Sequence, residues 1–70
     1  MVRVKIETKL GKNVRRFRKK LKISQEDLAF EAKIERSYVS TIERGQRNPS
    51  IQVVSKLAKA LKVTVSDLID

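Results

Sequence analysis

Apolar residues recur along the chain at steps of three and four, which is the spacing of one face of an α-helix. The first such stretch runs from Leu10 through Val14 and Phe17 to Leu21. At about 100° per residue these positions fall within roughly 60° of one another, so they predict one narrow buried stripe on a first helix. The other positions of that helix are mostly polar or charged and are expected to face solvent.

Two shorter helical patterns follow between residues 24 and 45. Ser24 stands before acidic residues, as the N-cap of a helix whose first turn favours negative charge. A turn at residues 33 to 35 separates this helix from the next one, which Gly45 is expected to end. Helices joined by so short a turn cross closely and need small or aliphatic inner residues, and the sequence supplies them at Leu28, Ala29, Ala32, Ile34, Val39 and Ile42.

Two more helices complete the predicted set. Pro49 disfavours helix at Asn48, and Ser50 caps a helix that is expected over residues 51 to 61. Thr64 has a similar capping pattern and opens a short terminal helix.

The first residues do not follow the helical pattern. Val2, Val4 and Ile6 alternate with basic residues as in a β-strand, but an isolated strand needs a partner edge, so a frayed arm is expected instead. The chain is therefore predicted to be all-α, with an N-terminal arm at residues 1–8 and a compact five-helix domain over residues 9–70.

The composition narrows the possible functions. The chain has 70 residues and neither cysteine nor histidine, so it predicts one domain with a thin core and without the usual zinc, thiolate and imidazole chemistry. We therefore expect no enzyme, no catalytic residue, no metal and no cofactor. No apolar run approaches the ~20 residues that span a bilayer, and the N-terminus lacks a signal-peptide pattern. These features predict a soluble, cytoplasmic protein without a membrane partner.

The charge is concentrated near the N-terminus. The whole chain has a formal net charge of +9, with 17 basic and 8 acidic residues. Residues 1–22 hold ten basic residues and one acidic residue, whereas residues 23–70 hold seven of each sign. Such a basic block is typical of proteins that bind a polyanion. Nucleic acid, an anionic membrane surface and a plain solvated helix face all stay open as interpretations.

The outward face of the third helix gives a more specific signal. Ser37, Ser40 and Thr41 lie opposite the apolar positions, and their small hydroxyl side chains would let the helix backbone enter a DNA groove. Arg36, in the first turn, can offer two hydrogen bonds to a guanine edge. An ordinary solvated helix would favour Glu, Lys and Ala here, so the pattern favours a helix-turn-helix that binds DNA.

Three segments together carry a resemblance to a known family, and they read Ile23-Ser24-Gln25-Glu26-Asp27-Leu28-Ala29, Ile34-Glu35-Arg36-Ser37-Tyr38-Val39-Ser40 and Ile42-Glu43-Arg44-Gly45-Gln46-Arg47-Asn48-Pro49-Ser50. The combined pattern resembles the XRE or lambda-repressor-like helix-turn-helix family over residues 9–70. Within that family the chain is most similar to the controller proteins of restriction-modification systems. The resemblance implies a sequence-specific transcriptional regulator that binds a two-fold related operator in double-stranded DNA as a homodimer.

The resemblance also implies which residues contact DNA. Gln25 would meet the DNA backbone and Arg36 would read bases. Arg44 and Arg47 would clamp phosphates on either side of Gly45. The full implied set is Gln25, Arg36, Ser37, Tyr38, Ser40, Thr41, Arg44, Arg47 and Asn48.

Two positions depart from the pattern of the family. Lys33 stands where the turn often has glycine, and a left-handed backbone there would cost about 1 kcal/mol. Glu35 replaces the better N-caps Asp, Ser and Thr before the third helix.

A homodimer is expected through the C-terminal half, because a module this small has little contact area of its own. The expected interface residues are Ile51, Val53, Val65, Leu68 and Ile69.

Other partners and functions stay open. The resemblance also implies a contact with RNA polymerase through acids near Glu26, Asp27 and Glu31, while Glu26 and Asp27 can equally be first-turn acids that the helix dipole favours. One alternative is an antitoxin or another protein-binding module with the same fold, and another is an interfacial membrane anchor formed by the first helix. RNA binding is less favoured, because Phe17, Phe30 and Tyr38 do not form a stacking platform.

Overall fold

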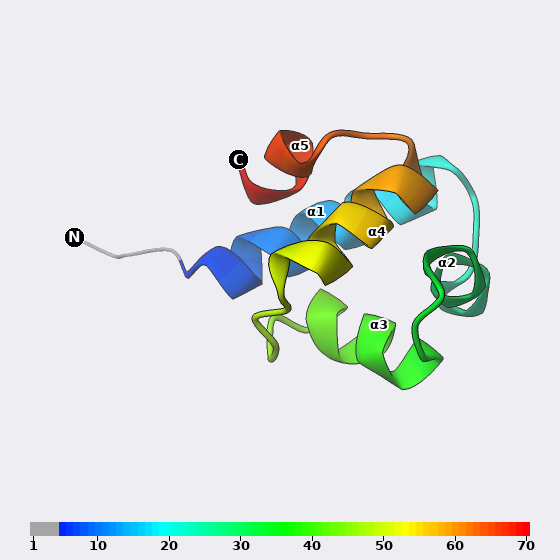
Figure 1. The fold of residues 1–70 in the computed structure, drawn as a ribbon, viewed down its shortest axis with the longest axis horizontal. Coiled ribbons are helices and arrows are strands. Elements are labelled where there is room, and N and C mark those ends of the chain that lie inside the picture. Colours follow the sequence, from blue (N-terminus) through cyan, green and yellow to red (C-terminus); the bar gives the residue numbers. More distant parts are fainter. Residues whose placement is uncertain (1–4) are drawn as a thin grey trace.

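The computed structural model describes residues 5–70, which form five α-helices joined by short connections (Figure 1). This all-α architecture confirms the predicted fold class. Within the described residues no helix is both long enough and apolar enough to cross a membrane. The helices are α1 (Ile6–Lys20), α2 (Gln25–Ala32), α3 (Arg36–Glu43), α4 (Ile51–Leu61) and α5 (Val65–Ile69).

One apolar core receives residues from every helix. Its largest fully buried side chains are Leu10, Val14, Leu28, Val39, Ile42, Leu57, Leu61 and Leu68. The predicted inner residues of α2 and α3 all belong to this core or pack against it. Leu21 differs from the prediction, because α1 ends at Lys20 and the side chain of Leu21 in the cap is 40% exposed.

Helix α1 begins earlier than the apolar spacing indicated. Residues 6–8, which the sequence assigned to an arm, form the first turn of α1. Its N-cap, Lys5, makes no side-chain capping hydrogen bond, so the start of the helix carries no local signal in the sequence. The rest of the expected arm, residues 1–4, lies outside the described residues.

The predicted capping signals are confirmed. Ser24 and Thr64 each form a reciprocal capping box with the aspartate three residues on, and Ser50 accepts a hydrogen bond from the Val53 backbone. The backbone hydrogen bond from Thr64 lowers the pKa of Asp67. Gly45 follows α3 with φ at +72°, as a terminating glycine should.

Gly11 explains how closely α1 and α3 approach each other. A Cβ atom at this position would clash with the backbone carbonyl of Ile42 and lie 3.0 Å from that of Glu43. The backbones of the two helices are therefore in direct contact at this point. One side of α3 faces α1 and the core, and the other side of α3 faces solvent.

Candidate nucleic-acid interface

The outward face of α3 brings together five of the nine predicted DNA-contact residues. Val39 and Ile42 are completely buried on the inner side of this helix. The opposite side forms a shallow depression lined by Arg36, Ser37, Ser40, Thr41 and Arg44.

Internal hydrogen bonds hold part of this surface in place. The Thr41 hydroxyl donates to the Ser37 carbonyl at 2.7 Å, which leaves the hydroxyl oxygen free to accept from a ligand. Arg44 donates from Nη1 to Ser40 Oγ at 3.1 Å. Arg36 is exposed and has no hydrogen-bond partner among the described residues. Its guanidinium is therefore open to a new acceptor.

Arg47 and Tyr38 extend the surface beyond α3. The guanidinium of Arg47 lies 5.2 Å from the centre of the Tyr38 ring, within the range of a cation–π contact. Tyr38 is half-buried and also packs against the core. Its ring is therefore held in place and offers Arg47 a fixed surface to pack on. Asn48 is exposed in the loop after α3.

A charged network behind α3 was not predicted. Arg18 donates from Nε and Nη2 to the two carboxylate oxygens of Glu43 at 2.7 and 3.0 Å, and from Nη1 to the Ile23 carbonyl at 2.9 Å. The side chains of Arg18 and Glu43 are only 12% and 4% exposed. The hydrogen bond from Arg18 to Glu43 raises the pKa of Arg18, so the guanidinium stays charged.

Gln25 joins this network rather than pointing freely outward. Its side-chain amide donates to Glu43 Oε1 at 3.1 Å. Glu43 thus ties the end of α3 to α1 and to the first residue of α2. The helical wheel placed Arg18 among solvated charges, and no short-range spacing could reveal a partner 25 residues away.

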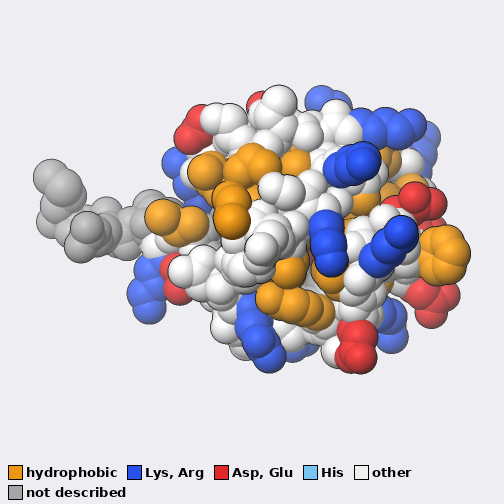
Figure 2. Space-filling model, in the orientation of Figure 1, with side chains coloured by type: hydrophobic (Ala, Val, Ile, Leu, Met, Phe, Trp, Pro, Cys, Tyr) orange, Lys and Arg blue, Asp and Glu red, His pale blue; other side chains and the backbone are white. Residues whose placement is uncertain are grey.

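Most basic residues of α1 are exposed, among them Lys12, Arg15, Arg16, Lys19 and Lys20. Figure 2 shows Lys and Arg side chains scattered around the visible face rather than gathered over one element. At their helical spacing the exposed basic residues of α1 span a wide arc, which favours long-range attraction of a polyanion over a set of direct contacts.

The expected dimer residues divide into two groups. Leu68 is completely buried in the core of its own chain, so it is not available to a partner and the expectation for this residue is wrong. Ile51 is 64% exposed and Ile69 is 38% exposed. Val53 and Val65 are half-buried.

Ile6, which was not predicted to join these residues, is 60% exposed at the start of α1. The starts of α1 and α4 and the end of α5 lie at the same end of the molecule (Figure 1), where Figure 2 shows apolar side chains at the surface. Ile6, Ile51 and Ile69, the exposed aliphatic residues of these three segments, are called the terminal apolar patch below.

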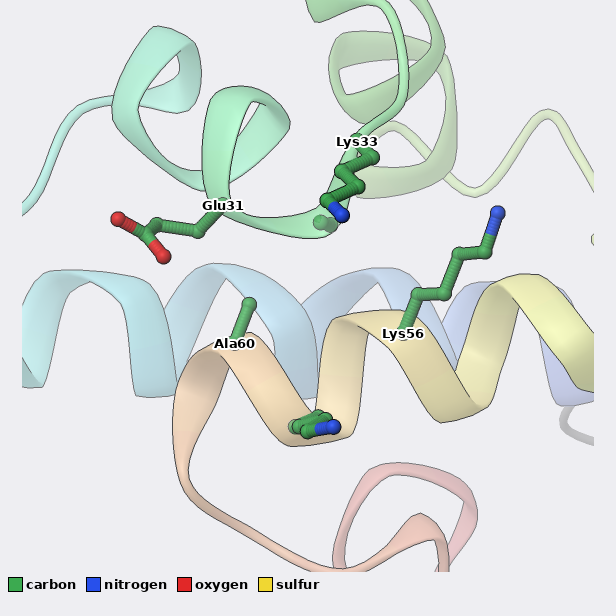
Figure 3. A pocket seen from close by; sticks show the side chains of 6 residues that line it. Glu31, Lys33, Lys56 and Ala60 are labelled. Carbon is green, nitrogen blue, oxygen red and sulfur yellow. The ribbon is translucent and has the colours of Figure 1, made fainter.

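Another surface depression lies between α2 and α4 and has a volume of about 510 Å³. Figure 3 shows that its polar side chains diverge: the carboxylate of Glu31 and the ammonium of Lys56 point away from each other. A ligand site needs polar groups that converge, so this depression does not compete with the α3 surface. Within residues 5–70 no group of three or more His, Cys, Asp or Glu residues is placed to hold a metal ion.

Comparisons with known proteins point in the same direction as the geometry. The helix-turn-helix family model matches residues 14–68. The control protein C.BamHI of Bacillus amyloliquefaciens is 49% identical over 61 residues, which cover 86% of this chain and 75% of that protein. The crystal structure of the restriction-modification controller protein C.AhdI from Aeromonas hydrophila superposes with a TM-score of 0.85 at 44% identity, covering 89% of this chain and 94% of that one. The controller C.Esp1396I bound to a 25 base pair operator site has a TM-score of 0.81 at 31% identity, covering 89% and 82%.

Proposed function

The chain belongs to the helix-turn-helix family, and on that premise we propose that it is a sequence-specific double-stranded DNA-binding transcriptional regulator. Helix α3 enters the major groove with the face that carries Arg36, Ser40 and Arg44. The observation that carries this proposal is the contrast between the two sides of α3, one completely buried and the other lined by hydroxyl and guanidinium groups.

The roles within this surface follow from what each side chain is free to do. Arg36 has an unengaged guanidinium in the first turn of α3, so it reads a base edge. Ser37, Ser40 and Thr41 are short enough to let the backbone approach, and Arg44, Arg47 and Asn48 meet phosphates beside them. The Tyr38 ring positions Arg47 through the cation–π contact. One amide N–H of Gln25 is bound to Glu43, and the other donates to the DNA backbone.

The terminal apolar patch supports a homodimer. Ile6, Ile51 and Ile69 expose aliphatic side chains that the chain does not cover itself. A two-fold pair joined at this patch places its two copies of α3 about 34 Å apart, one turn of DNA, and so binds a two-fold related operator. Since the relatives include control proteins of restriction-modification systems, we assign this chain the same controller role.

Selection of duplexes from a random DNA pool tests the function directly. We expect enrichment of a site with two related halves about 10 base pairs apart. A pool that stays random after several rounds, at a salt concentration that suppresses non-specific binding, would contradict the proposal.

The acids of α2 support a contact with RNA polymerase. Glu26 and Glu31 are exposed and have no ion-pair partner among the described residues. Replacing both by Gln should preserve DNA affinity and lower activated transcription from a promoter with a single dimer site. Unchanged activation would remove this contact from the proposal. Such a regulator works in the cytoplasm, where bacterial relatives have their DNA.

A further inference from the structure

Two neighbouring hydroxyl groups on the outward face of α3 are in opposite hydrogen-bonding states. Thr41 Oγ1 donates to the Ser37 carbonyl at 2.7 Å. A hydroxyl has one proton, so Thr41 has only lone pairs left to offer to another molecule. Ser40 Oγ instead accepts from Arg44 Nη1 at 3.1 Å and keeps its own proton. The helix therefore presents an acceptor at Thr41 and a donor at Ser40.

Thr41 lies in the middle of the surface that we propose for DNA. It lines both depressions on this face, one shared with Arg36 and the other shared with Arg47. It comes two positions after the completely buried Val39, and at about 100° per residue it lies about 160° around the helix from that side chain. With α3 in the major groove, this central position meets base edges, whereas the phosphates run along the two sides of the groove.

Two features hold the Thr41 oxygen in the acceptor state. The side chain is branched at Cβ, so few rotamers about χ1 are open to it. The bond to Ser37 has the usual length of a well-formed O–H···O hydrogen bond. A base that required a proton from Thr41 would first have to break this bond, which reduces what the new contact can contribute.

The edges of the bases in the major groove differ in what they offer to such an acceptor. Only the exocyclic amines at adenine N6 and cytosine N4 donate, whereas guanine O6, thymine O4 and the purine N7 atoms accept. An accepting atom placed against Thr41 loses its water without gaining a hydrogen bond, which disfavours that base. Every base pair carries one amine, on its adenine or its cytosine, so an acceptor selects the strand on which the amine lies.

We propose that Thr41 determines specificity as a hydrogen-bond acceptor and selects adenine or cytosine, the bases with an exocyclic amine, on one strand at its position in each operator half. This inference rests on the proposed function, because it concerns the surface that meets DNA. Arg36 has the opposite preference, because a guanidinium carries only donors. The two residues then read different base pairs by complementary chemistry, guanine by donation and an amine by acceptance.

Parallel selections from a random DNA pool test this role. Thr41→Val replaces the hydroxyl by a methyl group of similar size. Its selected site should lose the preference for adenine or cytosine at one position in each half and keep the other preferences, including the guanine that Arg36 reads. Thr41→Ser retains the hydroxyl and should retain the preference. Ser40→Ala, the matched control, removes the neighbouring donor hydroxyl and should retain the amine preference whatever its effect on affinity.

A base analogue tests the contact at the level of one amine. At the position that Thr41→Val identifies, adenine is replaced by unsubstituted purine, or cytosine by 2-pyrimidinone, each of which lacks the exocyclic amine. Wild-type affinity should fall about twofold to tenfold, the effect of one hydrogen bond. The amine should matter less to Thr41→Val by that same factor, and this comparison cancels effects of the analogue on the duplex itself.

The possible results separate the acceptor role from its alternatives. A Thr41→Val site identical to the wild-type site, or wild-type affinity that is unchanged by removal of the amine, would overturn the proposal. A preference that Thr41→Ser also loses belongs to the methyl group and not to the oxygen, and an equal loss of affinity on all sequences makes Thr41 a phosphate contact. A wild-type pool that stays random contradicts the proposed function itself, whereas a site that Thr41→Val shares contradicts only the acceptor role.

Discussion

Arg36 is the residue on which sequence recognition depends most directly. Its guanidinium is exposed in the first turn of α3 and has no partner among the described residues. We expect Arg36→Ala to cost ~1–3 kcal/mol on the selected site and little on random DNA, because a bidentate base contact is lost. Competition binding with both duplexes measures the difference.

Arg15→Ala is the matched control for Arg36→Ala, because Arg15 is an exposed arginine on α1. If Arg15 touches phosphate, its loss weakens both duplexes equally and lowers the salt slope by about 0.9. Should Arg36→Ala instead weaken every sequence equally, Arg36 is a phosphate clamp and base reading belongs to other residues of α3.

The buried pair of Arg18 and Glu43 controls whether α3 keeps its position. Removing one partner leaves the other charge buried, which typically costs about 3–5 kcal/mol. We therefore expect Glu43→Gln and Arg18→Met each to lower the urea midpoint strongly, and the double variant Arg18→Met with Glu43→Leu to recover much of it. A double variant less stable than both single ones would show that the pair itself, rather than the orphaned charge, is what the fold requires.

The pKa of Arg18 adds a pH dependence to this argument. Its folded pKa is raised above that of a free guanidinium, so the stability from its charge is complete below the free guanidinium's range and is lost only at still higher pH. The Arg18 guanidinium therefore does not limit stability at neutral or moderately alkaline pH.

Single residues also mark what the sequence could and could not predict. The α3 residues were predictable, because position on one helix face depends only on local spacing. The roles of Gly11 and Glu43 were not, because each depends on a crossing between helices that are distant in the chain. An isolated glycine inside a helical pattern was the available signal for that crossing.

At the scale of the elements, three connections share an unusual backbone feature. Lys22, Lys33 and Lys62 all have positive φ, near +60°, at or just after the ends of α1, α2 and α4. Glycine would adopt this conformation without the clash that a Cβ atom meets. A lysine at a helix C-terminus gains in return from the helix dipole, which favours positive charge there. The family pattern predicted this strain at Lys33. No pattern in the sequence predicted it at Lys22 or Lys62.

Replacing Lys33 by glycine should therefore stabilise the turn between α2 and α3. We expect Lys33→Gly to raise the free energy of unfolding by up to about 1 kcal/mol, less the small dipole contribution that is lost. Thermal melting at fixed protein concentration measures it, with Lys33→Ala as the control that removes the charge and keeps the Cβ atom. A stability gain equal in both variants would trace the effect to charge and not to backbone strain.

The elements differ in how well the sequence defines them. Helices with side-chain caps, such as α2, α4 and α5, begin where the capping residues indicated. Helix α1 has no such cap, and its first turn was taken for an arm because Ile6 fits an alternating pattern equally well. Local hydrogen-bonding chemistry thus fixes helix starts, and apolar spacing alone leaves them open by several residues.

For the whole molecule, the two ends differ in what they offer. One end carries the terminal apolar patch, and the other carries α2 with the exposed ring of Phe30. The DNA surface of α3 lies between them, so a dimer joined at the patch leaves the groove-facing side chains free. The sequence indicated the first of these surfaces, and only the fold brought Ile6 to it from the opposite end of the chain.

The terminal apolar patch gives the last prediction, which concerns the oligomeric state. Ile51→Asp places a charge in the patch and should convert the dimer to a monomer in sedimentation experiments at micromolar concentration. Ile51 is the first residue of α4, where an acid is favourable for the helix, so the fold should remain intact. Gln52→Asp adds the same charge at the next, exposed position and should stay dimeric. The monomer should also lose the preference for two half-sites over one. Wild-type protein that sediments only as a monomer at high micromolar concentration, with and without DNA, would exclude this interface.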